Sequence, residues 1–286
     1  MKFTKLQSAG NDFVLIEGKY AERNMQQLAK DACQRHFGIG ADGLLVLLPS
    51  EKANISMRVF NADGSEAEAC GNGLRCLVKY ASDNGFVAAN VDDLRVETIA
   101  GIRKARLLER SGNSRVIQSG MGKPEFSAAK IPVNAEASKG KLIDIMFSDY
   151  PLSIDSKELR LNFVAMGNPH AIYFQQQPVS GFPLSQIGPL VENNEIFPRR
   201  INFEIASVLD RKQIEARVWE RGVGETLACG SGACAMAVAA QILGYTDSPV
   251  EIKLPGGVLK VEWDMAGEVL LSGIAETVFS GEWLTD

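Results

Sequence analysis

The feature that most constrains the fold is a segment that occurs twice in the chain. Residues 58–75 read RVFNADGSEAEACGNGLR, and residues 217–233 read RVWERGVGETLACGSGA. Cys70 and Cys229 are 159 positions apart (229 minus 70), and the same offset relates the arginine that opens each copy and the glutamate in each turn. In each copy an apolar strand runs into a polar turn, and Ala-Cys-Gly-polar-Gly then opens a helix-like run. This self-similarity predicts two homologous lobes, with one cysteine at the same place in each.

A second echo precedes each cysteine turn. Residues 9–16, AGNDFVLI, are matched by residues 166–173, MGNPHAIY, so that Asn11 and Asn168 are 157 positions apart (168 minus 11). Each half therefore reads as a Gly-Asn turn, an apolar strand, a helix, further strands and the cysteine turn. The stretch 121–140, which contains two prolines and ends in glycine, is the best candidate for the boundary between the halves.

Hydrophobic periodicity and turn residues predict the individual elements. In the first half we expect a helix capped by Asn24 and ending near Arg35, strands at 44–48 and 55–60, a helix from Cys70 to 84–85, and a hairpin of 94–100 with 103–109. In the second half we expect strands at 141–147, 162–165, 172–174, 202–208, 213–219, 251–254, 257–263 and 269–272, and a helix at 184–191. The helix after Cys229, ACAMAVAAQILG, is apolar on every side, which predicts that sheet surrounds it.

Composition excludes several classes of protein. The chain has 286 residues, is 45% hydrophobic and 23% charged, and carries a net charge of −5, which is typical of a globular enzyme and argues against nucleic acid as a partner. The N-terminus has no apolar signal core, and residues 233–244 are too short to cross a membrane, so we expect a soluble, cytoplasmic protein. Five cysteines without zinc-knuckle spacing favour neither a disulfide framework nor a metal site.

The Cys-Gly-polar-Gly turns have the composition of a site. A helix that starts there presents N–H groups without intrahelical partners, and these can bind a substrate carboxylate. A cysteine at a helix N-terminus is expected to gain thiolate character. The alternative is that each cysteine is a small apolar filler at a helix start. Because the cysteine and the glycines occur in both copies while their neighbours differ, we favour the functional interpretation.

Two equivalent thiols suit inversion of a stereocentre. One base removes a proton from one face of a carbon atom, and an acid supplies a proton to the other face. The sequence shows no pyridoxal-phosphate lysine motif, and the glycine-rich stretch 38–43 lacks the strand-before, helix-after context of a dinucleotide site. We therefore expect an enzyme that needs no cofactor and whose site stabilises a carbanion-like transition state.

Other polar residues fit a small zwitterion. Glu220 and Arg221 follow a predicted strand and would bind an ammonium and a carboxylate, or else form a surface ion pair. His170 alone is more typical of a structural hydrogen bond. Four asparagines lie at strand ends or turns, where each by itself is most simply a turn residue: Asn11, Asn61, Asn168 and Asn202.

The chain resembles the diaminopimelate epimerase family along nearly its whole length. The resemblance rests on AGNDFVLIE, HFGIGADGLL, the two cysteine segments, GNPH and the strand at Asn202. It implies interconversion of LL- and meso-diaminopimelate without pyridoxal phosphate or metal. It also implies an α/β (α+β) fold of two homologous lobes related by pseudo-twofold symmetry, each a mixed sheet curled around a central helix, with the active site in the cleft between them. The implied lobes are residues 1–118 with about 275–286, and 119–274.

The resemblance also implies roles for individual residues. Cys70 and Cys229 fall on the acid/base pair of the family, and His170 and Glu220 on positions that assist catalysis. The substrate-binding positions are Asn11, Asn61, Gly71, Asn72, Asn168, Asn202, Glu220, Arg221, Gly230 and Ser231. The chain departs from the family at residues 7–9, where His-Gly-Leu is common, and at Gly43, where some members carry Gln, so recognition of the distal part of the substrate can differ.

Two other hypotheses remain open at this point. The same chemistry would serve another amino acid, or the chain would be a non-catalytic ligand-binding protein or redox switch whose paired cysteines form a disulfide. A homodimer is expected only as the commonest oligomer.

Overall fold

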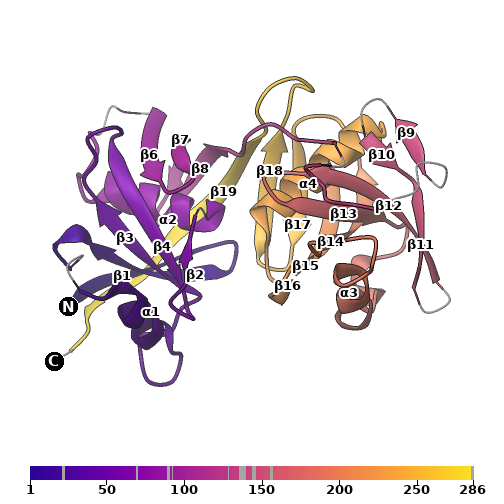
Figure 1. Cartoon of the computed structure of the whole chain (residues 1–286). Coiled ribbons are helices and arrows are strands. Elements are labelled where there is room, and N and C mark those ends of the chain that lie inside the picture. Colours follow the sequence, from indigo (N-terminus) through magenta and orange to yellow (C-terminus); the bar gives the residue numbers. More distant parts are fainter. Residues whose placement is uncertain are drawn as a thin grey trace. The chain divides into compact units, whose positions relative to one another are not determined.

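The chain divides into two compact units, Met1–Gly120 with Ser272–Asp286 and Met121–Leu271 (Figure 1). The computed structural model describes residues 1–20, 23–68, 70–88, 91, 93–127, 129–134, 140–143, 146–154 and 157–284. Some residues covered by the expectations above lie outside the described residues: 69, 128, 135–139, 144–145 and the last two of the chain. The boundaries predicted between the two homologous lobes, at 118/119 and near 275, stay predictions.

The strands of the first unit form a closed ring. Its elements are β1 (Lys2–Ser8), β2 (Asn11–Glu17), η1 (Gly18–Tyr20), α1 (Met25–Cys33), β3 (Gly43–Leu48), β4 (Ile55–Asn61), β5 (Glu66–Ala67), α2 (Gly71–Asp83), β6 (Asp93–Thr98), β7 (Gly101–Ser111), β8 (Ser114–Gly120) and most of β19 (Leu270–Glu282). Pairing runs β1–β2–β3–β4–β6–β7–β8–β19 and returns to β1, with β2–β3 and β4–β6 parallel and the other pairs for which a register is described antiparallel. Closure leaves no free edge in the ring.

Alternating side chains of the ring serve two cores. Leu45 and Leu47 of β3 point to the cluster built on α2, whereas Leu44 and Val46 point to the cluster built on α1. A strand that is covered on both faces reads as a continuous apolar run, as GLLVLL does. Helix α2 contacts six strands of the ring, so it lies inside it.

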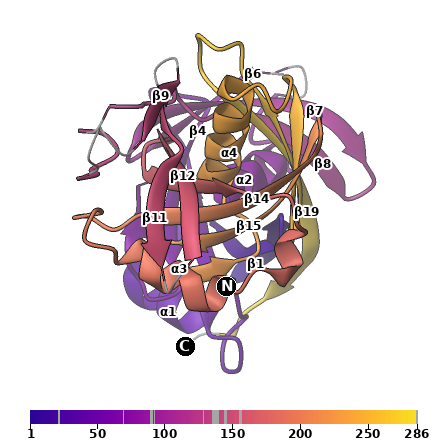
Figure 2. The same cartoon turned by 90° about the vertical axis from the view of Figure 1, so that its right-hand side faces the viewer.

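The second unit repeats this order around another helix. It contains β9 (Lys141–Ile143), β10 (Met146–Ser148), β11 (Tyr150–Ile154), β12 (Lys157–Ala165), β13 (Pro169–Phe174), η2 (Val179–Gly181), α3 (Leu184–Glu192), β14 (Asn202–Asp210), β15 (Gln213–Glu220), β16 (Gly224–Thr226), α4 (Gly230–Ile242), β17 (Val250–Leu254) and β18 (Gly257–Glu262). The series β12–β13–β14–β15–β17–β18 has the same parallel and antiparallel pattern as β1–β2–β3–β4–β6–β7. Figure 2 looks onto this unit, with α4 among its strands.

Most predicted elements are confirmed. Asn24 caps α1, which ends at Cys33, two residues earlier than expected. Helix α4 is buried on all sides because small alanines let strands approach it closely. The structure adds β1, β8 and β11, and it replaces the single strand expected at 141–147 by the hairpin β9–β10. It also extends the strand expected at 269–272 into β19, which pairs with β1 through residue Glu282. None of the described helices is long and apolar enough to cross a membrane.

Candidate active site

The two cysteines occupy the same structural position in their units. Cys70 is the N-cap of α2, and the backbone N–H of Gly73 donates to its sulfur at 3.4 Å. Cys229 is the N-cap of α4, and the N–H of Gly232 donates to its sulfur, also at 3.4 Å. Both have extended backbones, as N-cap residues do. The predicted placement of each thiol at a helix start is thus what the structure has.

An identical ion pair precedes each cysteine. Arg58 Nε and Nη2 donate to the two oxygens of Glu66 at 2.6 and 2.9 Å. Arg217 Nε and Nη2 donate to the two oxygens of Glu225 at 2.8 and 3.0 Å. A two-pronged pair of this kind fixes geometry as well as charge. It ties the strand before each turn to the short strand β5 or β16, from which the chain enters the helix.

Around Cys70, a chain of amides runs from a buried cation to an anion. Arg75 donates through Nε to Ser8 Oγ at 2.9 Å and through Nη2 to Asn72 Oδ1. Asn72 Nδ2 donates to Asn11 Oδ1 at 3.3 Å, and Asn11 Nδ2 donates to Asp42 Oδ2 at 2.9 Å. Because a guanidinium only donates and a carboxylate only accepts, both amides have a defined orientation. Asn11 therefore turns its oxygen towards Cys70, whose sulfur lies 4.0 Å away.

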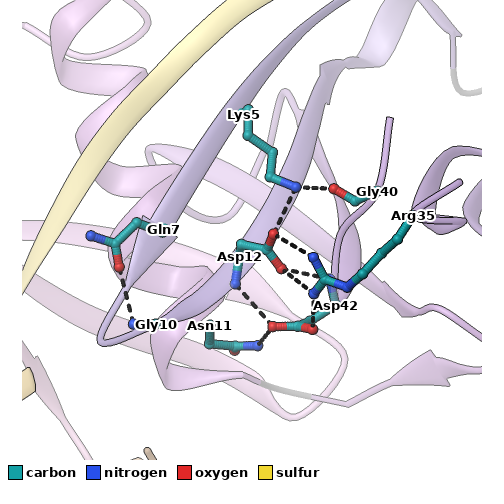
Figure 3. A network of polar contacts seen from close by, with 8 residues as sticks. All are labelled: Lys5, Gln7, Gly10, Asn11, Asp12, Arg35, Gly40 and Asp42. Atoms are coloured by element: carbon teal, nitrogen blue, oxygen red, sulfur yellow. Dashed lines mark hydrogen bonds and ion pairs between the residues drawn. The ribbon is translucent and has the colours of Figure 1, made fainter. Parts of the chain in front are cut away.

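Asp42 belongs to a charged cluster at the ends of β2 and β3 (Figure 3). Arg35 Nη2 donates to Asp42 at 2.7 Å and to Asp12 at 3.1 Å, and Lys5 Nζ lies 2.7 Å from Asp12. The backbone N–H of Asp12 donates to Asp42, and that of Asp42 donates to Asp12. Burial raises the pKa of Asp12, but hydrogen bonds from Lys5 and Arg35 outweigh it and lower the value to about 2. This cluster holds Asn11 in place through Asp42. In the sequence analysis, residues 38–43 were considered only as a dinucleotide site, so the cluster was not predicted.

The second unit orients its equivalent asparagine differently. His170 Nε2 lies 2.9 Å from Asn168 Oδ1, and His170 Nδ1 lies 2.6 Å from Glu204 Oε1. The side chains of His170 and Glu204 are both 0% exposed. Burial raises the pKa of Glu204, and His170 offsets part of this effect. Within the described residues, no group donates to the other oxygen of Glu204.

Cys229 is more deeply buried than expected and lies near the side chains of Glu220 and Glu204. It is buried, and Ser231 Oγ lies 3.4 Å from its sulfur. Burial raises the pKa of this thiol well above its ordinary value, and Glu220 and Glu204 raise it further, while Ser231 and Gly232 act in the opposite direction. The expectation that a helix start gives thiolate character is therefore wrong for Cys229, because desolvation and the nearby Glu220 outweigh the helix terminus.

The remaining predicted residues have protein partners in this structure. Asn202 Nδ2 donates to Pro169 O at 2.8 Å, and its Oδ1 accepts from the N–H of Arg221 at 2.9 Å. Thr226 donates to Glu220 at 2.6 Å. Asn61 donates to the hydroxyl of the turn residue Ser65. Of the other predicted residues, Gly71 and Gly230 are the first residues of α2 and α4. Arg221 Nη1 donates to Arg199 O.

Three residues of this neighbourhood were not predicted. None of the three, which are Arg75, Asp42 and Glu204, is singled out in the sequence analysis. Glu204 had a signal in the sequence: at the 159-residue offset it matches Leu45, so it is a charged residue at a core position of the repeat. In the described ranges, no three or more His, Cys, Asp or Glu side chains gather as they would to hold a metal ion.

Comparison with known proteins identifies the family. The sequence model of diaminopimelate epimerase matches residues 3–127 and 162–278. The chain belongs to the diaminopimelate epimerase family. A diaminopimelate epimerase of Acetivibrio thermocellus is 44% identical over 284 residues, covering 99% of this chain and 98% of the relative. One of Pelotomaculum thermopropionicum is 45% identical over 286 residues, with 99% of both chains covered. The family predicted from the motifs is confirmed.

Solved structures share the fold at low sequence identity. A PhzF-family phenazine biosynthesis protein of Bacillus anthracis has a TM-score of 0.71 and 16% identity, covering 100% of this chain and 99% of its own. A probable proline racemase of Agrobacterium radiobacter has a TM-score of 0.69 and 13% identity, with coverage of 100% and 93%. The predicted mixed α+β fold class is confirmed, with strands wrapped around a central helix in each unit. The pseudo-twofold relation and the cleft stay predictions.

Proposed function

We propose that this member of the diaminopimelate epimerase family interconverts LL- and meso-2,6-diaminopimelate by a two-base proton transfer between Cys70, Cys229 and the α-carbon. Family membership supports the reaction and its substrate. The observation that carries the assignment of the bases is the repeated N-cap: each thiol receives the N–H of the third helical residue at 3.4 Å. The first turns of α2 and α4 also offer unpaired N–H groups for a carboxylate.

The two thiols start from different protonation states in this proposal. Burial and the nearby Glu220 carboxylate favour the neutral thiol of Cys229. Cys70 then acts as the thiolate that removes the α-proton, and Cys229 delivers its S–H proton to the opposite face of the same carbon. One C–H bond breaks and another forms, so the substrate gains and loses one proton. Cys70 leaves the step as a thiol and Cys229 as a thiolate, ready for the reverse reaction.

Binding residues are proposed on the positions that match the family. Gly71, Asn72, Gly230 and Ser231 begin the two helices, where backbone N–H groups stabilise negative charge that develops on the substrate carboxylate. His170 and Glu220 would assist the proton transfers, and the substrate-binding set is completed by Asn11, Asn61, Asn168, Asn202 and Arg221. Since several of these side chains already have protein partners, substrate would replace or extend those hydrogen bonds.

Proton exchange tests the proposal directly. Purified protein with LL-diaminopimelate in heavy water should form the meso isomer and incorporate deuterium at the inverted α-carbon. Cys70→Ala and Cys229→Ala should each lose roughly a thousandfold or more of epimerase activity. Cys33→Ala, a buried cysteine of α1, is the matched control and should retain activity. Full activity in either catalytic variant would refute the two-base assignment, and exchange into another amino acid but not diaminopimelate would refute the substrate.

We also propose a cytoplasmic homodimer, supported only by the general frequency of dimers and by the family's role in lysine and peptidoglycan precursor biosynthesis. Light scattering on the purified chain and cell fractionation test these two statements separately.

A further inference from the structure

A buried acid lies behind the second cysteine turn, at a place where the first unit has a leucine. Glu204 is on the face of β14 that is turned towards α4, and its Oε1 would lie 2.9 Å from a Cβ atom on Gly232. Gly232 is the residue whose N–H donates to Cys229. The absence of a side chain at this helical position is therefore what admits the carboxyl group beneath the first turn of α4.

The hydrogen bonds of Glu204 are those of a neutral acid. It makes a 2.6 Å contact with His170 Nδ1, and no described group donates to its second oxygen. A buried carboxylate with an unpaired oxygen is costly, whereas the carbonyl oxygen of a protonated acid loses much less when it has no partner. Burial favours the same state by raising the pKa of Glu204. The other titratable groups near Glu204 are Glu220 and Cys229, and an ionised Glu220 also opposes a second negative charge.

A protonated Glu204 determines the rest of the chain of contacts. Its hydroxyl donates to His170 Nδ1, so a neutral imidazole carries its proton on Nε2. That N–H donates to Asn168 Oδ1 at 2.9 Å. The orientation of the Asn168 amide is then fixed, because its oxygen accepts from His170. Its NH2 group remains a donor, and no described residue accepts a hydrogen bond from it. Asn11, its counterpart, has the opposite orientation, because Asp42 occupies its nitrogen and leaves its oxygen facing Cys70.

We propose that Glu204 is a positioning residue for the epimerisation: as a buried neutral acid it fixes the Nε2–H tautomer of His170, and through it the donor orientation of Asn168. This inference rests on the proposed function, because Asn168 matters only if it binds the substrate. The two equivalent asparagines then differ: Asn168 offers an amide N–H, whereas the oxygen of Asn11 accepts from Asn72 Nδ2 and faces the Cys70 sulfur.

The chain has only two histidines, so imidazole nitrogen NMR can test the tautomer without measuring activity. In protein labelled with 15N-histidine, His170 should show a protonated Nε2 and an unprotonated Nδ1. His36 is exposed, and the variant His36→Gln assigns its signals. A doubly protonated His170 in the unmodified protein would overturn the proposal whether or not the protein turns over diaminopimelate.

Two substitutions separate positioning from simple packing. The amide of Glu204→Gln can still donate to His170 Nδ1, so its His170 spectrum should be unchanged and its kcat/KM should stay within about threefold of the unmodified value. Glu204→Leu, which copies Leu45 of the first unit, removes the donor; it should alter the His170 tautomer and lower kcat/KM about ten- to a hundredfold, with a raised KM. An altered His170 tautomer in Glu204→Gln, or an unchanged tautomer and KM in folded Glu204→Leu, would contradict the proposal. Loss of epimerisation in the unmodified protein with the predicted spectrum intact would instead contradict the proposed function.

Discussion

The two cysteine turns share a backbone plan but differ in the chemistry that surrounds them. Each has an N-capping thiol, an Arg–Glu pair and a glycine at the third helical position. The strands that support them diverge, because Leu45 in the first unit corresponds to Glu204 in the second. At the 157-residue offset, Phe13 likewise corresponds to His170. The shared parts fix where a sulfur lies, and the divergent parts fix what it contacts.

Inside the helices, it is the first unit that has the ionisable side chain and the second that has a small one. Arg75 of α2 is fully buried and orients Asn72, whereas its counterpart in α4 is Cys234, a small buried residue. The first unit therefore places a buried ionisable side chain in the helix, and the second places one in the sheet. A duplicated scaffold can make two bases inequivalent in this way, as a reaction that needs one acid and one base requires.

The largest expected contrast between the turns is thiol reactivity. Cys229 is buried and the pKa of its thiol is raised, whereas Cys70 is half-buried. Because only the thiolate is alkylated, and its fraction falls about tenfold per pH unit below the pKa, iodoacetamide should label Cys70 at least about a hundredfold faster than Cys229 near neutral pH. Peptide mapping by mass spectrometry measures both rates in one sample. Equal labelling would remove the proposed difference in their starting protonation states.

A matched pair of glycine substitutions should give a smaller contrast. A Cβ on Gly232 would lie 2.9 Å from Glu204 Oε1, and one on Gly73 would lie 2.9 Å from a methyl group of Leu45. A leucine methyl can rotate away, but the carboxyl group is held by His170. Gly232→Ala should therefore lower kcat/KM about tenfold, with Gly73→Ala within about threefold. Steady-state kinetics of the two variants would contradict this if Gly73→Ala were the more damaged.

The charged cluster around Asp12 is not repeated among the described residues of the second unit, where Pro169 stands at the matching position. Burial raises the pKa of Asp12, and Lys5 and Arg35 lower it to about 2, below the ordinary 3.8. Its ionised form therefore contributes stability that is present above pH 3.8 and is lost as the pH falls towards 2. Asp12→Asn should cost about 1–2 kcal/mol of unfolding free energy at neutral pH, after allowance for the exposed Arg35.

Urea unfolding at several pH values checks the sign of this effect. The difference between Asp12→Asn and the unmodified protein should shrink on acidification through that window. A difference that is constant with pH would show that Asp12 stabilises the fold by packing instead of by its charge.

The smallest contrast is expected between the two Arg–Glu pairs. Arg217 also donates to the backbone oxygens of Val179 and Phe182 at 3.0 and 2.9 Å, and it is less exposed than Arg58. Arg217→Gln should therefore destabilise by about 1–2 kcal/mol and Arg58→Gln by about 0.5–1 kcal/mol. Denaturation midpoints at fixed pH measure both, and the reverse order would refute the argument.

Local patterns predicted the helices and the thiol positions because each has a short-range cause. Asn24 and the two cysteines are followed at once by helical periodicity, so the caps were visible in the sequence. The strands β1 and β8 were missed although each has a neighbouring hairpin partner, β2 or β7; the other partner of both, β19, is about 150 to 280 residues away along the chain. No local pattern carries that information.

The same limit applied to the surroundings of the cysteines. That Asn11 would be a polar residue at a turn could be predicted, but not that Asp42 would hold its nitrogen, since the contact joins two parallel strands across 31 positions. The raised pKa of Cys229 was missed because burial, unlike a helix start, depends on the complete packing around α4. Closer comparison of the repeats would have drawn attention to Glu204.

The pairing of β19 with both β1 and β8 has a consequence for biosynthesis. Until residues 272–282 have left the ribosome, the first unit has two strands with unpaired backbone edges, which nascent chains can use to associate with one another. The amino-terminal half of this protein must therefore wait for the last part to be synthesised before it can complete its fold, even though its own helices and hairpins are made first.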